Sequence, residues 1–281
     1  MKPKTNRETL ILDGGGSSLK VYLRTDSGLE LKARHDGDFN WQTGKRPRII
    51  RALSNAMARF PVKRAMIGLA GVVSPKDKAF IRALFAERRV RAMSDLELAF
   101  ELHFPNQDGI VVILGTGSIF AAKLGGRVVK IGGYGRAIGD AGSGYAIGQE
   151  ATRKFLQSLD GFFRDEIFLA AMKRTFRSKN DAIRKVYQEG FALQTLAPVV
   201  FECAENGSPL AIDIVENQIS NVARYIERLR EASDSALPVR LLGGLLERET
   251  IYSRRLLETL RRANVKLQPC DYGASPSFPK Q

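Results

Sequence analysis

The sequence predicts an α/β protein made of two similar domains, and two observations lead to this prediction. Short apolar segments typical of strands alternate with longer amphipathic segments typical of helices, as in α/β folds. A group of three strands with a glycine-rich first turn occurs near the start of the chain and recurs about one hundred residues later. We therefore expect a first domain over residues 1–107 and a second domain over residues 108–281.

The first domain is expected to begin with a meander and continue with alternating helices and strands. Its strands are predicted within residues 9–13, 19–25, 29–34, 64–71 and 90–95. A polar loop over residues 35–44 precedes a helix near residues 46–60. A second helix is predicted after Ser74, because serine suits the N-cap position and Pro75 the first helical position.

The second domain repeats this order. Residues 110–133 contain a strand, a glycine-rich turn, a second strand, the Gly125-Gly126 hairpin and a third strand. Helices are predicted from about residue 144, within residues 161–190, and over residues 208–231 and 248–263. The segment over residues 208–231 has apolar residues at steps of three and four, which indicates an amphipathic helix. Two further strands are predicted at residues 239–244 and 265–269.

The composition is that of a globular protein with an excess of basic residues. Hydrophobic residues make up 44% of the 281 residues, enough to bury one large core or two smaller ones. The 44 Lys and Arg against 30 Asp and Glu give a net charge of +14 and a pI near 10.0. These charges are spread through amphipathic segments such as residues 45–60 and 253–263, which favours a solvated surface. Basic residues interleaved with aromatic ones are not evident, so nucleic acid is not an expected partner.

Cysteine, histidine and hydropathy exclude several classes of protein. Cys203 and Cys270 cannot supply the four thiolates of a zinc or iron–sulfur site, and we expect both to be reduced. His35 and His103 have no partner at metal-ligand spacing, and His103 is expected at a helix end or in packing. No segment approaches the ~20 apolar residues of a membrane span or has a leader pattern. We therefore expect a cytoplasmic protein with no membrane partner.

Two turns rich in glycine and hydroxyl residues are the candidate functional elements. They are DGGGSS (13–18) and GTGS (115–118), one at the head of each domain. Either turn alone has two interpretations: a tight hairpin that needs positive φ angles, or a cradle of backbone N–H groups for an anion. The pair is well placed to hold one polyphosphate. Gly243-Gly244 follows a predicted strand, where a nucleotide base or ribose could lie against the bare backbone. The other interpretation of this pair is a simple strand-to-helix turn.

The motifs DGGGSS, GLAG (68–71), SD (94–95), GTGS, GGYGRAIGDAGSGYAIGQEA (132–151) and LLGG (241–244) occur together, in this order. With them, nearly the whole chain resembles the BadF/BadG/BcrA/BcrD ATPase family. Within that family it resembles the N-acetylglucosamine and glucosamine kinases, of the superfamily of sugar kinases, actin and heat-shock chaperone ATPases. The resemblance implies two ribonuclease-H-like (actin-like ATPase) domains, with a cleft between them that binds ATP and a sugar.

The resemblance also implies residue roles. Asp95 would be the catalytic base, and Asp13 would hold Mg²⁺ directly or through water. The residues that would contact ATP are Gly15, Gly16, Ser17, Ser18, Gly115, Thr116, Gly117, Ser118, Gly243 and Gly244. Those that would contact the sugar are Asn40, Gly133, Tyr134, Gly135 and Asp140. A carboxylate that follows a strand, as Asp95 does, can accept the proton of a substrate hydroxyl, but alone it is better explained as a helix N-cap.

The implied activity is transfer of the γ-phosphoryl group of ATP to an amino sugar, N-acetylglucosamine or glucosamine, with the 6-hydroxyl as the expected acceptor. An alternative is a non-catalytic or regulatory nucleotide-binding protein of the same fold that uses its basic surface on nucleic acid. The sequence departs from the family at Ala141, where an acidic residue is common, and it ends soon after residues 271–278, where relatives continue with a helix. The sequence leaves open whether the protein is a monomer or a homodimer.

Overall fold

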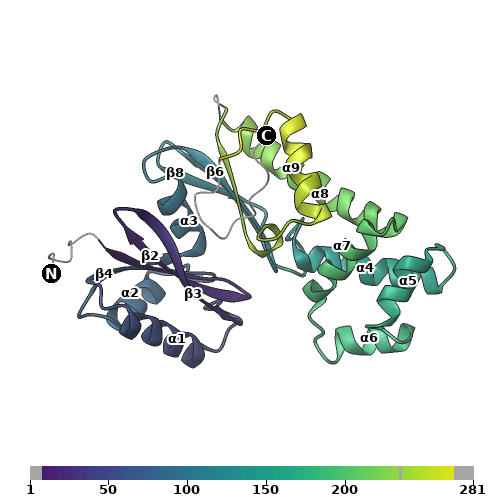
Figure 1. Ribbon diagram of the computed structural model, residues 1–281, viewed down its shortest axis with the longest axis horizontal. Helices are drawn as coiled ribbons and strands as arrows, with labels where there is room; N and C mark the ends of the chain where they lie inside the picture. Colours follow the sequence, from purple (N-terminus) through teal and green to yellow (C-terminus); the bar gives the residue numbers. More distant parts are fainter. Residues whose placement is uncertain (1–7, 234–235, 269–281) are drawn as a thin grey trace. The chain divides into compact units, whose positions relative to one another are not determined.

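The computed structural model describes residues 8–233 and 236–268, and these divide into two compact units. The first unit contains the described residues up to Gln107, and the second contains those from Asp108 onward. Each unit has its own β-sheet and its own hydrophobic core (Figure 1).

The first unit is built on a five-stranded sheet. Its strands, in sequence order, are β1 (Thr9–Gly14), β2 (Ser18–Thr25), β3 (Gly28–Asp36), β4 (Arg64–Leu69) and β5 (Arg89–Ser94). Their order in the sheet is β3-β2-β1-β4-β5; β2 is antiparallel to its neighbours, and β1, β4 and β5 are parallel. The parallel strands therefore all end at the same edge of the sheet.

Helices cover both faces of this sheet. Helices α1 (Arg46–Arg59) and α2 (Pro75–Ala83) pack on the face to which β1 contributes Leu10 and Leu12 (Figure 1). Helix α3 (Asp95–His103) packs on the other face, where its Leu98 joins Ile11 of β1. This division follows the alternation of side chains along each strand. His103 ends α3 and is buried, as expected.

The second unit is built on a four-stranded sheet that repeats the meander of the first. Its strands are β6 (Gly109–Leu114), β7 (Ser118–Leu124), β8 (Arg127–Ile131) and β9 (Val239–Leu242). The order is β8-β7-β6-β9, with β6, β7 and β8 antiparallel and β9 parallel to β6. The predicted repetition of a three-stranded meander is confirmed.

Six α-helices complete the described part of the second unit. They are α4 (Gly144–Leu159), α5 (Glu166–Lys173), α6 (Lys179–Tyr187), α7 (Ala197–Glu205), α8 (Pro209–Glu231) and α9 (Ile251–Arg262). Two 3₁₀ turns accompany them, η1 (Leu193–Leu196) and η2 (Gly244–Leu246). The predicted amphipathic helix is α8, whose Tyr225 stacks on Phe120 of β7 with the ring centroids 4.5 Å apart. That contact seats α8 against the sheet.

Two segments differ from the sequence prediction. Helix α7 was not predicted, because its apolar run has no clear helical period to reveal a buried helix. The strand predicted at residues 265–269 is wrong in its described part, where Leu267 forms only an isolated bridge with Val239. Strand β9 is four residues long, so it offers little backbone for a further partner. Pro269, Cys270 and residues 271–278 lie outside the described residues.

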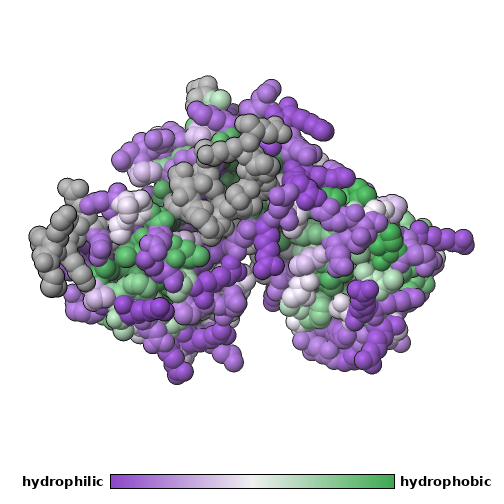
Figure 2. Space-filling view, in the orientation of Figure 1, coloured by the Kyte–Doolittle hydropathy of each residue, from purple (hydrophilic) through white to green (hydrophobic). Residues whose placement is uncertain are grey.

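Among the described residues, no helix combines the length and apolar composition required to cross a bilayer. In the view of Figure 2, hydrophilic residues cover much of the described surface of both units.

Candidate nucleotide and sugar site

The first candidate element is the turn between β1 and β2, residues Gly15, Gly16 and Ser17, which we call turn 1. Two of its carbonyl groups are bound by the protein: Gly15 O accepts a hydrogen bond from Phe39 N and Ser17 O from Gly37 N, both at 2.9 Å. The backbone N–H groups of Gly16 and Ser17 make no hydrogen bond with any described residue. Consecutive N–H groups of this kind form a binding site for an anion.

The glycines of turn 1 are not required by backbone conformation. None of Gly14, Gly15 and Gly16 has a positive φ, so the interpretation of a hairpin that needs positive φ is wrong here. Gly14 is required by packing, because a Cβ there would lie 2.5 Å from Leu69 Cδ2. A Cβ on Gly15 would meet nothing within 4 Å. Neither backbone strain nor packing therefore requires glycine at position 15, and the backbone there is open to the surroundings.

The two carboxylates predicted in the first unit lie at one edge and on one face of its sheet. Asp13 is in register with Gly68 of β4, which is in register with Met93 of β5, two residues before Asp95. With strands about 4.8 Å apart, the backbones at the ends of β1 and β5 are roughly 10 Å apart. Asp13 shares a face with Ile11 by strand alternation, and this face is covered by α3, whose first residue is Asp95.

The helix-capping explanation of Asp95 is wrong, because Ser94 is the N-cap of α3. Ser94 Oγ accepts from Glu97 N at 3.1 Å, and Glu97 Oε2 accepts from Ser94 N at 2.8 Å. Lys78 of α2 holds Glu97 through a 2.7 Å ion pair. A Cβ on Gly68 would lie 2.6 Å from Leu98 Cβ, so bare backbone at Gly68 lets α3 sit close to β4. These contacts fix the start of the helix, and Asp95 Oδ1 accepts a 2.9 Å hydrogen bond from Leu96 N.

Asn40 lies in a loop that is anchored on both sides at this same edge. Its neighbour Phe39 donates to turn 1, and Trp41 N donates to Ala70 O, just beyond β4, at 2.7 Å. The side chain of Asn40 accepts a 2.9 Å hydrogen bond from Gln42 N at Oδ1. Its amide N–H groups make no hydrogen bond within the described residues, so they are available as donors to a ligand.

In the second unit the corresponding element is the turn between β6 and β7, residues Gly115, Thr116 and Gly117, which we call turn 2. Its carbonyl groups are bound by the first turn of α4: Gly144 N donates to Gly115 O at 2.8 Å and Tyr145 N to Thr116 O at 3.1 Å. The N–H groups of Thr116 and Gly117 make no hydrogen bond with described residues. Turn 2 therefore offers the same pair of free donors as turn 1.

Asp140 is packed directly against turn 2. A Cβ on Gly117 would lie 2.7 Å from Asp140 Oδ2, so glycine is required there to make room for the carboxylate. Asp140 has a φ of 60°, an unusual conformation for a residue with a side chain. Burial raises the pKa of its carboxyl group, while the nearby N–H groups of Gly135 and Ser118 and the charge of Lys130 oppose that rise.

The other predicted sugar-binding residues lie in the loop that follows β8. Gly133 and Gly135 have positive φ angles of 63° and 89°. A Cβ on Gly133 would lie 3.2 Å from Ser118 O, which places this loop beside turn 2. Tyr134 is 63% exposed. The structure thus brings Gly133 and Asp140 to turn 2 and leaves the ring of Tyr134 in solvent.

Two side chains that the sequence analysis did not identify, one of them buried, hold the end of this loop. Tyr252 of α9 donates from its hydroxyl to Gly142 O at 2.7 Å, and Gln218 Oε1 of α8 accepts from Gly142 N at 2.9 Å. Tyr252 is fully buried, and burial raises the pKa of its hydroxyl. Each contact joins residues far apart in sequence, so no local pattern could have revealed it.

The glycine pair after β9 lies next to turn 2. Gly243 has a φ of 107°, and a Cβ there would collide with the backbone of Leu114, so the fold itself requires this glycine. Gly244 has no positive φ, and a Cβ would meet nothing within 4 Å. Gly244 N would lie 3.9 Å from a Cβ on Gly115. The strand-to-turn interpretation therefore accounts for Gly243 and leaves Gly244 open to a ligand.

Two buried polar atoms near turn 2 have no hydrogen-bond partner among the described residues: Ser118 Oγ and Gln194 Oε1. Ser118 is 7% exposed and follows the turn directly. Gln194 Cβ would lie 3.3 Å from a Cβ on Gly144, at the start of α4. Leaving a buried polar group unpaired costs about 1–3 kcal/mol. Gln194 is a further candidate ligand contact that the sequence did not suggest.

The described residues contain no group of three or more His, Cys, Asp or Glu that could hold a metal ion. Mg²⁺ is commonly held by one or two carboxylates, with phosphate oxygens and water completing its ligands. A single carboxylate such as Asp13, beside a turn with free N–H groups, fits Mg²⁺ that arrives with a nucleotide. It does not fit a resident metal held by the protein alone.

Comparison with known proteins agrees with this geometry. The chain is 29% identical over 204 residues to an N-acetylmuramic acid/N-acetylglucosamine kinase of Clostridium acetobutylicum, a match covering 66% of each protein. It is 24% identical over 252 residues to a glucosamine kinase of Vibrio cholerae, covering 84% of each. The crystal structure of a candidate N-acetylglucosamine kinase from Chromobacterium violaceum has a TM-score of 0.74 at 22% identity, covering 93% of this chain and 94% of that one.

The likeness to the Chromobacterium violaceum structure confirms the expected fold class, an α/β protein of the ribonuclease-H-like, actin-like ATPase type. The sequence pattern of the BadF/BadG/BcrA/BcrD ATPase family matches residues 12–270, most of the chain. The protein therefore belongs to the BadF/BadG/BcrA/BcrD ATPase family.

Proposed function

We propose that the protein is an ATP-dependent amino-sugar kinase that phosphorylates the 6-hydroxyl group of N-acetylglucosamine or glucosamine. One observation carries the proposal: each unit presents a glycine turn whose carbonyl groups are bound by the protein and whose two consecutive N–H groups are free. Such donors suit the oxygens of a polyphosphate. The names of the relatives support an amino sugar as the acceptor.

In this proposal the two turns bind the phosphates of ATP. Ser17, Ser18, Thr116 and Ser118 add hydroxyl donors, and the unpaired Oγ of Ser118 would find its partner in a phosphate oxygen. The bare backbone at Gly244 leaves room for the adenosine. Asp13 holds Mg²⁺, which when bound neutralises charge on the phosphates.

Asp95 is the proposed general base. Its carboxylate accepts the proton of the sugar hydroxyl and orients the oxygen for in-line attack on the γ-phosphorus. The bond to the β-phosphate oxygen breaks, and ADP leaves. Asn40, through its free amide N–H groups, and Asp140, through its carboxylate, hold other hydroxyl groups of the sugar, with Gly133, Tyr134 and Gly135 beside them. Phosphoryl transfer depends mainly on such positioning.

The proposal is tested by ATP consumption with N-acetylglucosamine, glucosamine, N-acetylmuramic acid and glucose, each with Mg²⁺. We expect an amino sugar to give the highest kcat/KM, and carbon and phosphorus NMR spectra of the product to place the phosphate on the 6-oxygen. A regulatory nucleotide-binding protein would bind ATP but consume none with any of these sugars. That result would reject the kinase proposal.

Asp95→Asn is the decisive variant. It should bind ATP nearly as wild type does and lower kcat by roughly 10²–10⁴-fold, the usual effect of removing a general base. Glu101→Gln is the matched control, because it makes the same chemical change on the same helix, at a residue whose ion pair with Arg91 spans 2.6 Å. We expect full activity in the control. Unchanged kcat in Asp95→Asn would remove Asp95 from the mechanism.

A further inference from the structure

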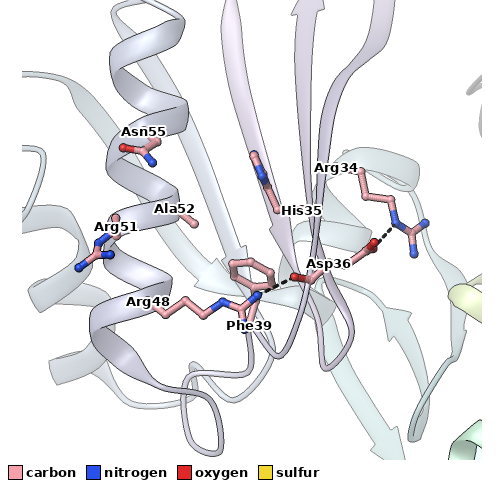
Figure 3. Close-up of a pocket in the computed structure, with 8 residues that line it drawn as sticks. All are labelled: Arg34, His35, Asp36, Phe39, Arg48, Arg51, Ala52 and Asn55. Atoms are coloured by element: carbon pink, nitrogen blue, oxygen red, sulfur yellow. Dashed lines mark hydrogen bonds and ion pairs between the residues drawn. The ribbon is translucent and has the colours of Figure 1, made fainter.

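The first unit contains an open pocket that the proposed kinase chemistry does not use. Its volume is about 410 Å³, and it lies between the end of β3 and helix α1 (Figure 3). The lining residues from β3 and the loop after it are Arg34, His35, Asp36 and Phe39, and those from α1 are Arg48, Arg51, Ala52 and Asn55. This volume lies in the range of small-molecule sites.

The lining is rich in hydrogen-bond donors. Three arginines and one acidic residue line it, and that residue, Asp36, already accepts a 3.2 Å ion pair from Arg34 Nε. The side chains of Arg51, Asn55 and His35 make no hydrogen bond or ion pair with any described residue. Arg48, Arg51 and Asn55 recur at helical spacing along α1; in Figure 3 the side chain of Arg48 extends toward β3, and that of Arg51 lies on the outer side of the helix. An occupant must therefore be rich in acceptors and negatively charged.

Arg48 contacts the segment that joins β3 to the loop containing Asn40. Its Nη2 donates to Asp36 O at 2.8 Å, and its guanidinium lies 6.0 Å from the centre of the Phe39 ring. A Cβ on Gly37 would lie 2.5 Å from Arg48 Nη2, so this glycine leaves the space that the guanidinium fills. This hydrogen bond and this ring contact hold the exposed guanidinium of Arg48 at one wall of the pocket.

We propose that this pocket binds the phosphoryl group of a small phosphorylated molecule. A phosphoryl group offers three strong acceptor oxygens and a charge of about −1.5 to −2 at pH 7, which matches guanidinium donors on several sides. The pocket is also coupled to turn 1, because Gly37 and Phe39, which flank its inner wall, donate to Ser17 and Gly15. The pocket residues are not part of either turn, so the site stands independently of the kinase proposal.

The two histidines of the chain make a direct test possible. His35 lines the pocket, and His103 is buried at the end of α3, so the full-length protein labelled with ¹³C-histidine has one reporter and one internal control. His35→Gln assigns the two NMR signals. Inorganic phosphate and N-acetylglucosamine 6-phosphate are titrated separately, without ATP, and unphosphorylated N-acetylglucosamine is the third arm.

We expect both phosphorylated probes to shift the His35 signal in a saturable way and to leave His103 in place. A tighter response to the sugar phosphate would identify an organic phosphate as the natural ligand, and an equal response would identify free phosphate. Arg51→Glu should weaken the response at least tenfold, since it replaces a donor by a repelling carboxylate. Arg82→Glu, the same charge change on α2 outside the pocket, should not alter it.

Asn55→Asp is a second pocket variant, at an exposed position where folding is not at risk, and it should also weaken the response. Four results would overturn the proposal. They are an unmoved His35 signal, an equal response in Arg51→Glu and wild type, an equal shift with unphosphorylated sugar, and a response to a short oligonucleotide that is stronger than the response to phosphate and falls steeply with salt.

Discussion

Turn 1 and turn 2 have the same construction but different surroundings. In both, neighbouring backbone N–H groups bind the carbonyl groups, and two consecutive N–H groups of the turn make no hydrogen bond with any described residue. Turn 1 is held by the extended segment Gly37–Phe39, and its Gly16 and Ser17 are exposed. Turn 2 is held by the start of helix α4 and by the carboxylate of Asp140, and it is half-buried.

The difference separates two situations for a glycine in these turns. At Gly117 the protein itself needs the space, whereas at Gly15 it does not. Turn 2 is therefore a prearranged element whose shape depends on its own unit. Turn 1 has open space beside Gly15, which is where the proposed ligand would lie.

The largest expected effect on stability or ATP binding comes from substituting valine at Gly117 or at Gly15. Gly117→Val places atoms against Asp140, and overpacking of this kind typically lowers the free energy of unfolding by 1–3 kcal/mol. Gly15→Val should leave stability within about 0.5 kcal/mol of wild type but weaken ATP binding. Thermal denaturation and calorimetric ATP titration measure the two quantities. Equal loss of stability in both variants would show that the turns are built alike.

Removal of a distant support tests how far turn 2 depends on its surroundings. Tyr252→Phe removes the hydrogen bond to Gly142 O inside the core, which we expect to cost about 1–2 kcal/mol of stability. Tyr187→Phe makes the same change at a residue that is 84% exposed and should have no effect. Urea denaturation of the two variants gives the comparison. A Tyr252→Phe protein as stable as wild type would mean that α9 does not hold the loop before α4.

The smallest expected effect is a dependence on pH. Burial raises the pKa of Asp140, so the folded protein binds this proton more tightly than the unfolded chain does. Wild type should therefore gain stability relative to Asp140→Asn as pH falls from neutrality toward the ordinary value near 4, and lose that gain as pH rises. Urea denaturation at a series of pH values measures this difference. A constant difference between the proteins would contradict the raised pKa.

Asp181 is a control of the opposite sign. Its carboxylate accepts from Arg177 N at 2.9 Å, which is the main reason that its pKa falls to about 2. The contribution of this group to stability is present above about pH 4 and is lost as pH falls toward 2. Wild type should thus lose its advantage over Asp181→Asn on acidification, whereas it gains on Asp140→Asn.

Local features of the sequence were enough to predict most of the fold. Strand alternation and turn chemistry predicted both meanders, and Ser74 and Pro75 predicted the start of α2, where Ser74 Oγ accepts from Asp77 N at 3.0 Å. The formation of helix α7 and of the isolated bridge at Leu267 depends on the residues that pack against these segments in the folded protein. Such neighbours are set by tertiary structure, and hydrophobic period alone does not encode them.

The sequence indicated which residues to consider for the candidate site, but it did not show the structural reason for each of them. The glycine turns were visible, yet the sequence could not show that Gly117 makes room for Asp140, or that Gly15 needs neither space nor positive φ. The pocket beside α1 was equally hidden, because its arginines come from two elements and its wall depends on Gly37. Contacts between residues distant in sequence cannot be read from a single amino-acid sequence.

The hydrogen atom that stands in place of a methyl group at Gly68 acts as a spacer between α3 and β4. Because Leu98 occupies that space, the thickness of one residue in the middle of the sheet sets how far the first turn of α3 stands from the strands. The position of Asp95, the first residue of α3, relative to the sheet therefore depends on a residue of β4 that lies beneath the helix.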